Sequence, residues 1–88
     1  MVKFELYFTN RAEKDKKLIK QAGLEGKARE LLAIVQKNPY QNPPQYEKLV
    51  GNLQGFYSRR INIQHRLVYQ VYDTEKKVKI LRMWTHYE

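Results

Sequence analysis

The first half of the chain carries one strand-like pattern followed by two helix-like patterns. Residues 2–9 alternate apolar and polar side chains, and this period of two predicts a strand with one buried face. Asn10 fits the N-cap of a helix that Gly23 would end. A second helix is predicted over 24–37, because apolar residues recur there at helical spacing and Pro39 disfavours helical geometry in the residue before it.

Beyond a loop at 38–45 that holds all the prolines, the apolar period changes from helical spacing to alternation. Strands are predicted at 49–53, 57–63, 66–72 and 78–84. Turn residues separate them at Gly55, at Gln64-His65 and at 73–76. This order predicts an α+β fold, β-α-α-β-β-β(-β), in which both helices pack on one face of a mainly antiparallel twisted sheet.

The length of 88 residues predicts a single domain, 1–88. The chain has no cysteine, which excludes disulfides and thiolate metal sites. No apolar run approaches the roughly 18 residues that a membrane span needs, and the charged N-terminus is unlike a signal peptide. We therefore expect a soluble cytoplasmic protein with no membrane partner.

The charge balance is strongly basic, with 17 lysines and arginines, 9 acidic residues and a formal net charge of +8. Such a domain favours polyanions, such as nucleic acid, or an acidic protein partner. No acidic residue lies between Glu47 and Asp73, a window that holds Lys48, Arg59, Arg60 and Arg66. The lysines at 14–20 are better explained as a solubility surface. For the arginines, an anion site is at least as good an explanation as a solubility surface.

The second half also carries the residue types that metal-free RNA cleavage requires. A base must take the 2′-hydroxyl proton, cations must balance the developing negative charge, and an acid must protonate the departing 5′-oxygen. The candidates are Glu47 as base, Arg59, Arg60 and Arg66 as cations, and His86 with Tyr87 as acid. Ordinary roles also remain open, such as a surface pair of Glu47 with Lys48 or a structural carboxylate partner for Arg66. His65 is expected to have a loop or turn-stabilising role in the predicted hairpin turn.

Aromatic residues accompany these basic strands and allow two interpretations. Exposed rings would stack on RNA bases, whereas buried rings would fill a small core. We assign Phe56, Tyr69 and Trp84 mainly to packing and leave Tyr57, Tyr72 and Tyr87 open. The sequence has neither a phosphate-binding glycine loop nor a His or Cys cluster with ligand spacing, so no cofactor and no metal is expected.

The second half resembles the YoeB branch of the RelE superfamily of toxins almost position by position. The likeness rests on EKLVGNLQGFYSRRI from Glu47 to Ile61, on HRLVY from His65 to Tyr69, and on the closing His86-Tyr87. The first half matches that family only in the order of its elements. The resemblance implies a RelE-like fold and the toxin component of a type II toxin-antitoxin system.

By this resemblance the protein would be a ribosome-dependent endoribonuclease that cleaves mRNA in the ribosomal A site and inhibits translation. The products would carry a 2′,3′-cyclic phosphate and a 5′-hydroxyl. Glu47 would be the general base, Arg66 the stabiliser of the transition state and His86 the general acid. Tyr87 would orient the substrate or the leaving group. RNA or ribosome contacts would come from Lys48, Tyr57, Arg59 and Arg60.

The implied partners are the ribosome with its mRNA and a cognate acidic antitoxin whose disordered tail folds over the toxin. Some members of the family form dimers, so a homodimer of this protein is one of the expected states. One alternative function is a non-catalytic RNA- or protein-binding module on the same scaffold. Another is the gyrase-directed branch of the superfamily, against which the closing His86-Tyr87 pair argues.

Overall fold

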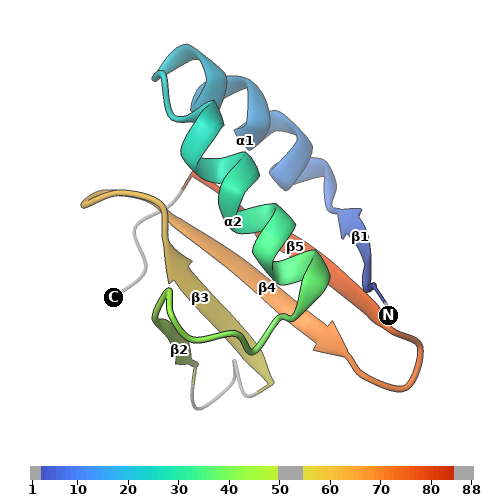
Figure 1. Ribbon diagram of the computed structural model, residues 1–88. Helices are drawn as coiled ribbons and strands as arrows, with labels where there is room; N and C mark the ends of the chain where they lie inside the picture. Colours follow the sequence, from blue (N-terminus) through green and yellow to red (C-terminus); the bar gives the residue numbers. More distant parts are fainter. Residues whose placement is uncertain (1–2, 50–54, 85–88) are drawn as a thin grey trace.

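The computed structural model describes residues 3–49 and 55–84, which form a five-stranded sheet and two helices (Figure 1). The elements are β1 (Glu5–Phe8), α1 (Asn10–Gln21), α2 (Glu25–Lys37), β2 (Tyr46–Lys48), β3 (Phe56–Arg60), β4 (Arg66–Tyr72) and β5 (Lys77–Arg82). Their order across the sheet is β1-β5-β4-β3-β2, and only the β1–β5 pair is parallel. The predicted α+β class with a mainly antiparallel sheet is therefore confirmed.

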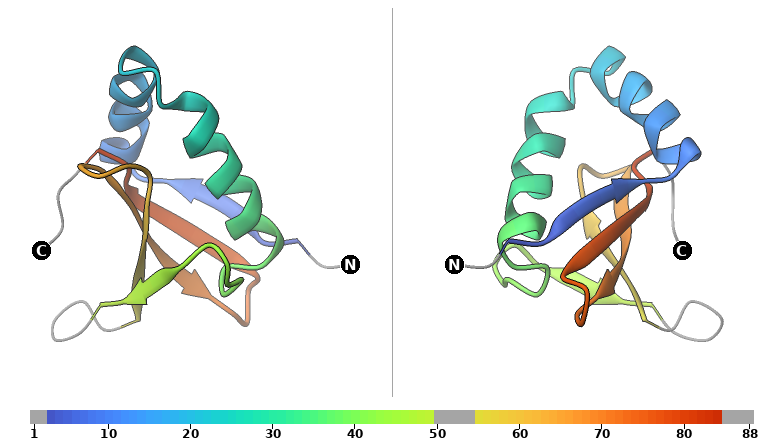
Figure 2. Two further views of the ribbon diagram at one scale, coloured as in Figure 1. Left: turned by 60° about the vertical axis from the view of Figure 1, so that its left-hand side comes forward. Right: turned by 90° about the vertical axis from the view of Figure 1, so that its right-hand side faces the viewer.

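Both helices lie against one face of this sheet, as the two side views show (Figure 2). Their apolar stripes meet the inward side chains of the central strands in one buried cluster. The cluster includes Ile19, Ala28, Leu31 and Val35 from the helices and Leu67, Tyr69, Val78 and Ile80 from the strands. Each large apolar side chain buried there contributes about 1.5–3 kcal/mol relative to an exposed one. The helices do not cover the opposite face of the sheet.

Each helix start differs from the predicted one by one residue, since α2 begins at Glu25 and the N-cap of α1 is not Asn10. The N-cap of α1 is Thr9, whose Oγ1 accepts a hydrogen bond from the Ala12 backbone N–H at 3.1 Å. The same hydroxyl donates to the Leu81 carbonyl at 2.9 Å, which ties the helix start to the sheet. The prediction of Asn10 as N-cap is therefore wrong by one residue. Gly23 has a φ of 74° and follows the end of α1, as predicted.

Strand β4 has the predicted limits, whereas β3 and β5 end earlier than the sequence pattern indicated. After β3 the chain turns over 61–64, because the Asn62 carboxamide oxygen accepts from the backbone N–H groups of Gln64 and His65, at 2.8 and 2.7 Å. Such a side-chain to backbone bond replaces strand pairing with a turn. The apolar Ile63, which had suggested a longer strand, is 88% exposed in that turn.

Strand β2 was not predicted. The expected strand at 49–53 lies mostly outside the described residues, and Leu49 itself follows the end of β2. Tyr46–Lys48 shows no apolar alternation, so only its antiparallel pairing with β3 identifies it as a strand.

None of the helices in the described part of the chain has the length and apolar character that crossing a membrane requires.

Candidate active site

The register of three neighbouring strands places the predicted base and the predicted phosphate ligand on one face of the sheet. Glu47 in β2 lies opposite Ser58 in β3, which lies opposite Val68 in β4. Residues that are directly opposite in a sheet point to the same side, and so do residues two apart in a strand. Arg66 therefore shares this side with Glu47. Leu67 lies between Arg66 and Val68 and points into the helix-covered core, so the Arg66 face is the one that the helices do not cover.

Arg66 and Glu47 are in contact there. The Arg66 Nη1 lies 3.3 Å from the Glu47 Oε1 and 3.4 Å from the Ser58 Oγ. The Arg66 side chain is 20% exposed and that of Glu47 is 55% exposed. An ion pair this open to water is worth roughly 0–1 kcal/mol. Both contacts use Nη1 and neither engages Nη2, so a phosphate could replace Glu47 as the partner of the guanidinium at little cost.

The pair lines a hollow of about 360 Å³, whose wall is formed by Pro44, Gln45, Glu47, Ser58, Arg60 and Arg66. This volume falls within the range of small-molecule sites, roughly 300–1,000 Å³. Arg60 and Arg66 are directly opposite in the β3–β4 pair, and like charges in that position repel each other. With one carboxylate for two guanidinium groups, the hollow has an excess of positive charge. An anion such as a phosphodiester would relieve it.

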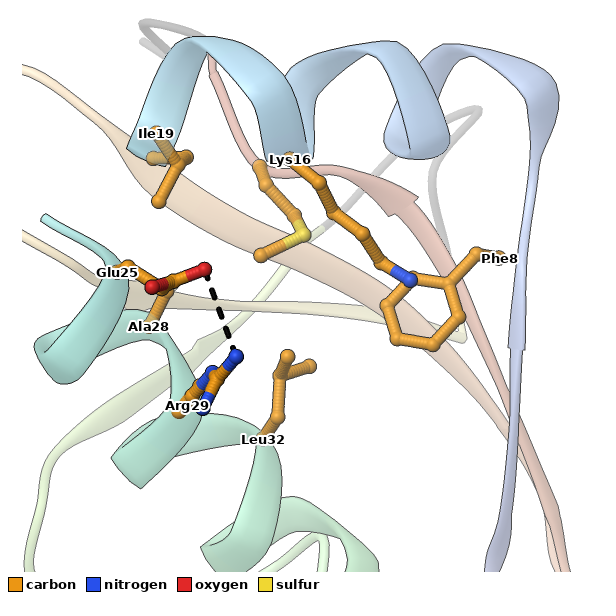
Figure 3. Close-up of a pocket in the computed structure, with 8 residues that line it drawn as sticks. Phe8, Lys16, Ile19, Glu25, Ala28, Arg29 and Leu32 are labelled. Atoms are coloured by element: carbon orange, nitrogen blue, oxygen red, sulfur yellow. Dashed lines mark ion pairs between the residues drawn. The ribbon is translucent and has the colours of Figure 1, made fainter. Parts of the chain in front are cut away.

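A second hollow, of about 220 Å³, lies between α1 and α2 and has a different character (Figure 3). Its wall is mainly apolar and includes Phe8, Ile19, Leu32 and Met83. The charged residues at its edge are already engaged. The Lys16 ammonium lies 3.6 Å from the centre of the Phe8 ring, and the Arg29 Nη2 lies 3.5 Å from a carboxylate oxygen of Glu25. This hollow therefore differs from the first in its mainly apolar wall, and the cations at its edge come from α1 and α2 rather than from the sheet.

The burial of Arg59 contradicts the prediction that this residue contacts RNA. Its side chain is only 1% exposed and points to the helix side of the sheet. The guanidinium donates to the carbonyls of Pro39, Gln41 and Pro44 at 3.1, 2.8 and 2.6 Å, and its Nε donates to the Tyr69 hydroxyl at 3.0 Å. The buried guanidinium therefore provides hydrogen bonds to carbonyl groups of the protein's own backbone.

Arg59 instead fixes the proline-bearing loop that leads into β2. The Tyr69 hydroxyl adds a bond to the Pro39 carbonyl at 2.8 Å. Burial raises the pKa of Tyr69, although the neighbouring Arg59 charge opposes this, so the phenol stays neutral and can donate. At the same loop, burial and a 2.8 Å bond to Asp73 raise the pKa of Tyr40. The loop ends at β2, so these bonds also set the position of Glu47.

The aromatic residues that had two interpretations are mostly packed. Tyr57 lies on the helix side, in ring contact with Tyr40, Tyr46 and Tyr69 at centroid distances of 5.6, 5.8 and 5.8 Å. Tyr57 therefore lies on the other side of the sheet from Arg66, and its predicted RNA contact is wrong for a nucleotide held beside Arg66. Packing is confirmed for Tyr69 and Trp84. Phe56 and Tyr72 are half-buried, and the Tyr72 hydroxyl donates to Gln70 at 2.8 Å.

The remaining predicted residues fall into three groups. Lys48 and Arg60 are exposed, and Arg60 belongs to the hollow. His86 and Tyr87 lie outside the described residues, so their roles stay predictions. His65 is buried, and its ring stacks on Trp84 with a centroid distance of 3.7 Å and an interplanar angle of 18°. Its backbone N–H serves the turn, as expected, but the ring has a packing role that the sequence did not indicate.

This fold is that of the small YoeB- and RelE-type toxins. A solved YoeB/ParE toxin from Agrobacterium tumefaciens matches with a TM-score of 0.86 and 26% identity, covering 96% of this chain and 100% of that one. YoeB in the YoeB-YefM complex from Staphylococcus aureus matches with a TM-score of 0.79 and 38% identity, covering 96% and 98%.

Sequence comparison gives the family. The profile of the YoeB-like toxin of bacterial type II toxin-antitoxin systems matches residues 5–87. Toxin YoeB of Synechocystis is 36% identical over 76 residues, which are 86% of this chain and 79% of that protein. Toxin YoeB of Escherichia coli K12 is 41% identical over 61 residues, which are 69% and 66% of the two chains. The chain belongs to the YoeB-like toxins of type II toxin-antitoxin systems.

Proposed function

We propose that this toxin is a ribosome-dependent endoribonuclease that cleaves mRNA in the ribosomal A site and so inhibits translation. The observation that carries the proposal is the meeting of Glu47 and Arg66 at 3.3 Å in a hollow that Arg60 also lines. These residues supply a proton acceptor and two cations around a space that accepts a phosphodiester. Membership in the YoeB family supports the same activity.

The proposed reaction is an internal transesterification. The Glu47 carboxylate takes the proton of a ribose 2′-hydroxyl, and that oxygen attacks the adjacent phosphorus to form an O2′–P bond. The P–O5′ bond breaks with its electron pair, and His86 donates a proton to the departing 5′-oxygen. The products are a 2′,3′-cyclic phosphate and a 5′-hydroxyl. Tyr87 is proposed to orient the substrate or the leaving group.

Arg66 is proposed to stabilise the transition state, in which negative charge grows on the non-bridging oxygens. Its planar guanidinium can donate two parallel hydrogen bonds, and β4 holds it in place before the reaction begins. When the phosphate takes over the guanidinium, the Glu47 carboxylate loses its ion-pair partner and becomes available to the 2′-hydroxyl. Substrate binding and activation of the base are thereby linked.

The partners are proposed from the family and from the charge. Relatives have been solved as a YoeB-YefM toxin-antitoxin complex and as a YoeB dimer, both from Staphylococcus aureus. For this chain, a net charge of +8 supports a cognate acidic antitoxin, the ribosome and mRNA as partners. Lys48 and Arg60 are proposed to contact the RNA or the ribosome. A homodimer is a further possibility that the S. aureus relative suggests.

Primer extension on programmed ribosomes tests the function. We expect discrete cuts within the A-site codon that require the ribosome. Glu47→Gln and His86→Ala should each slow the cuts by about 10²–10⁴-fold, the usual contribution of a general base or acid. Lys16→Gln, which changes an exposed lysine near the other hollow, should cleave as the unchanged protein does. Binding without cuts would support a non-catalytic module, and inhibition of gyrase supercoiling would support a gyrase-directed toxin.

A further inference from the structure

We propose that the sheet face opposite the helices, which carries Arg66 and the hollow, also binds the single-stranded RNA beside the cut. We call it the helix-free face (Figure 2). The inference deepens the proposed function, because it gives the mRNA a path away from the hollow, and it rests on that function for the choice of RNA as ligand. It also gives a role to aromatic residues that the cleavage mechanism does not use.

The strand register places two rows of side chains on the helix-free face. The first row is Phe56, Gln70, Lys79 and Tyr7, and the second row is Tyr72, Lys77 and Glu5. The residues between the rows, such as Leu6, Val71 and Val78, belong to the helix-side core or pack against it. Because side chains alternate along a strand, both rows point away from the helices.

These rows continue the surface of the hollow. Phe56 and Ser58 are two residues apart in β3 and point to the same side, so the first row begins about 7 Å from the hollow-lining Ser58. Arg66 and Tyr72 are the two ends of β4, which are about 20 Å apart. An RNA strand with one phosphate beside Arg66 can therefore run along β4 and place further bases on the two rows.

The aromatic rings of both rows are accessible. Tyr7 is 43% exposed, and Phe56 and Tyr72 are half-buried. The Tyr7 hydroxyl donates to the Glu5 carboxylate and the Tyr72 hydroxyl donates to the Gln70 side-chain oxygen, each at 2.8 Å. Both hydroxyls are thus engaged within their own strands, and the rings are what a ligand would contact. Rings on an open sheet stack on unpaired bases of any sequence.

The charge of the two rows favours RNA over a protein partner. Lys77 and Lys79 lie among the aromatic residues, and the Lys77 Nζ is 5.2 Å from the centre of the Tyr7 ring. Glu5 is the single acidic residue of the two rows, and its carboxylate already accepts from Tyr7. Lysine is depleted in protein–protein interfaces, whereas aromatic rings beside positive charge are typical of single-stranded RNA sites.

Binding of the free protein to an unstructured RNA of about 12 nucleotides tests the inference, with fluorescence anisotropy as the readout. Tyr72→Ala is expected to raise Kd about 5–100-fold, the loss that corresponds to one stacked base. Tyr72→Phe keeps the ring and should bind within about twofold of the unchanged protein. Leu18→Ala removes a partly exposed apolar side chain from α1 and should leave Kd unchanged. Circular dichroism verifies that each variant is folded.

The lysines are tested through the salt dependence of the same binding, which also serves if Tyr72→Ala does not fold. Replacing both Lys77 and Lys79 with glutamine should flatten the slope of log Kd against log salt concentration by about 1.4, or about 0.7 for each phosphate contact. Replacing Lys14 and Lys17 removes the same charge from exposed positions of α1 and should change the slope by less than about 0.3. Equal changes for the two pairs would refute a defined RNA-binding face.

The ribosome assay separates this inference from the proposed function. Tyr72→Ala should raise the toxin concentration that half-saturates cleavage and leave the rate at saturation within about threefold. If the unchanged protein makes no ribosome-dependent cuts but Tyr72→Ala weakens RNA binding, the proposed function fails and the RNA-binding face stands. If the cuts occur and Tyr72→Ala binds free RNA as tightly as the unchanged protein, the function stands and the face is refuted.

A second copy of the chain is the competing occupant of this face. Sedimentation velocity of the unchanged protein and of Tyr72→Ala distinguishes it from RNA. The same oligomeric state is expected for both proteins. A Tyr72→Ala variant that dissociates a dimer while it keeps its RNA affinity would make the face a protein interface and would overturn the proposal.

Discussion

Replacing Arg66 with alanine is expected to slow single-turnover cleavage of ribosome-bound mRNA by about 10²–10³-fold. The guanidinium lies beside Glu47 in the hollow, where the proposed reaction would develop phosphate charge. Charge that is stabilised specifically in the transition state lowers the barrier, so the loss should appear in the rate at saturating toxin. Quenched time courses with end-labelled mRNA measure it.

Arg60→Ala is the matched control, because Arg60 lines the same hollow directly opposite Arg66 and is exposed. It should weaken binding of the ribosome complex and change the saturated rate by less than about tenfold. Arg66→Lys should recover only part of the rate, since an ammonium cannot donate as a planar fork. Equal losses of saturated rate for Arg60→Ala and Arg66→Ala would contradict the role given to Arg66.

Replacing Arg59 with methionine is expected to lower the free energy of unfolding by about 3–5 kcal/mol, without any direct effect on RNA binding. Methionine keeps an unbranched apolar stem but removes every donor. The carbonyls of Gln41 and Pro44 would then lose their Arg59 bonds in the interior, and the Tyr69 hydroxyl would lose its donor. Urea denaturation followed by circular dichroism gives the change.

Arg60→Met provides the comparison for Arg59, because it changes the next residue of β3 at an exposed position. Its stability should stay within about 0.5 kcal/mol of the unchanged protein. Arg59→Lys should not restore stability, since a single ammonium cannot reach three carbonyls in different directions. An Arg59→Met protein that keeps its stability but loses ribosome binding would return Arg59 to the RNA-contact role.

The parts of the fold that could be predicted are those with an uninterrupted apolar period. Strand β4 has its predicted limits because Leu67, Tyr69 and Val71 alternate with the residues of the other face. Strand β2 could not be predicted in the same way. Its three residues have no apolar alternation, and what makes them a strand is hydrogen bonding to β3, whose partners lie beyond the 50–54 segment.

The candidate residues could be listed from the sequence by their chemistry, but the choice of Glu47 and Arg66 over ordinary surface roles came only from the family resemblance. The contact between Glu47 and Arg66 depends on the register of β2, β3 and β4, which local patterns do not encode. The burial of Arg59 was missed for a related reason. An arginine in a basic strand suggests a surface charge, and only the backbone carbonyls of Pro39, Gln41 and Pro44 make its burial possible.

A single 2′-deoxy nucleotide in the mRNA tests most directly whether the bond is cut through the ribose 2′-hydroxyl that Glu47 is proposed to deprotonate. The substitution is placed on the 5′ side of the cut mapped in unmodified mRNA, and the ribosome complex is otherwise unchanged. We predict that cleavage at that bond is lost while binding of the toxin persists, and that unmodified mRNA yields a 2′,3′-cyclic phosphate. Cleavage of the 2′-deoxy mRNA at an undiminished rate would contradict the proposed mechanism.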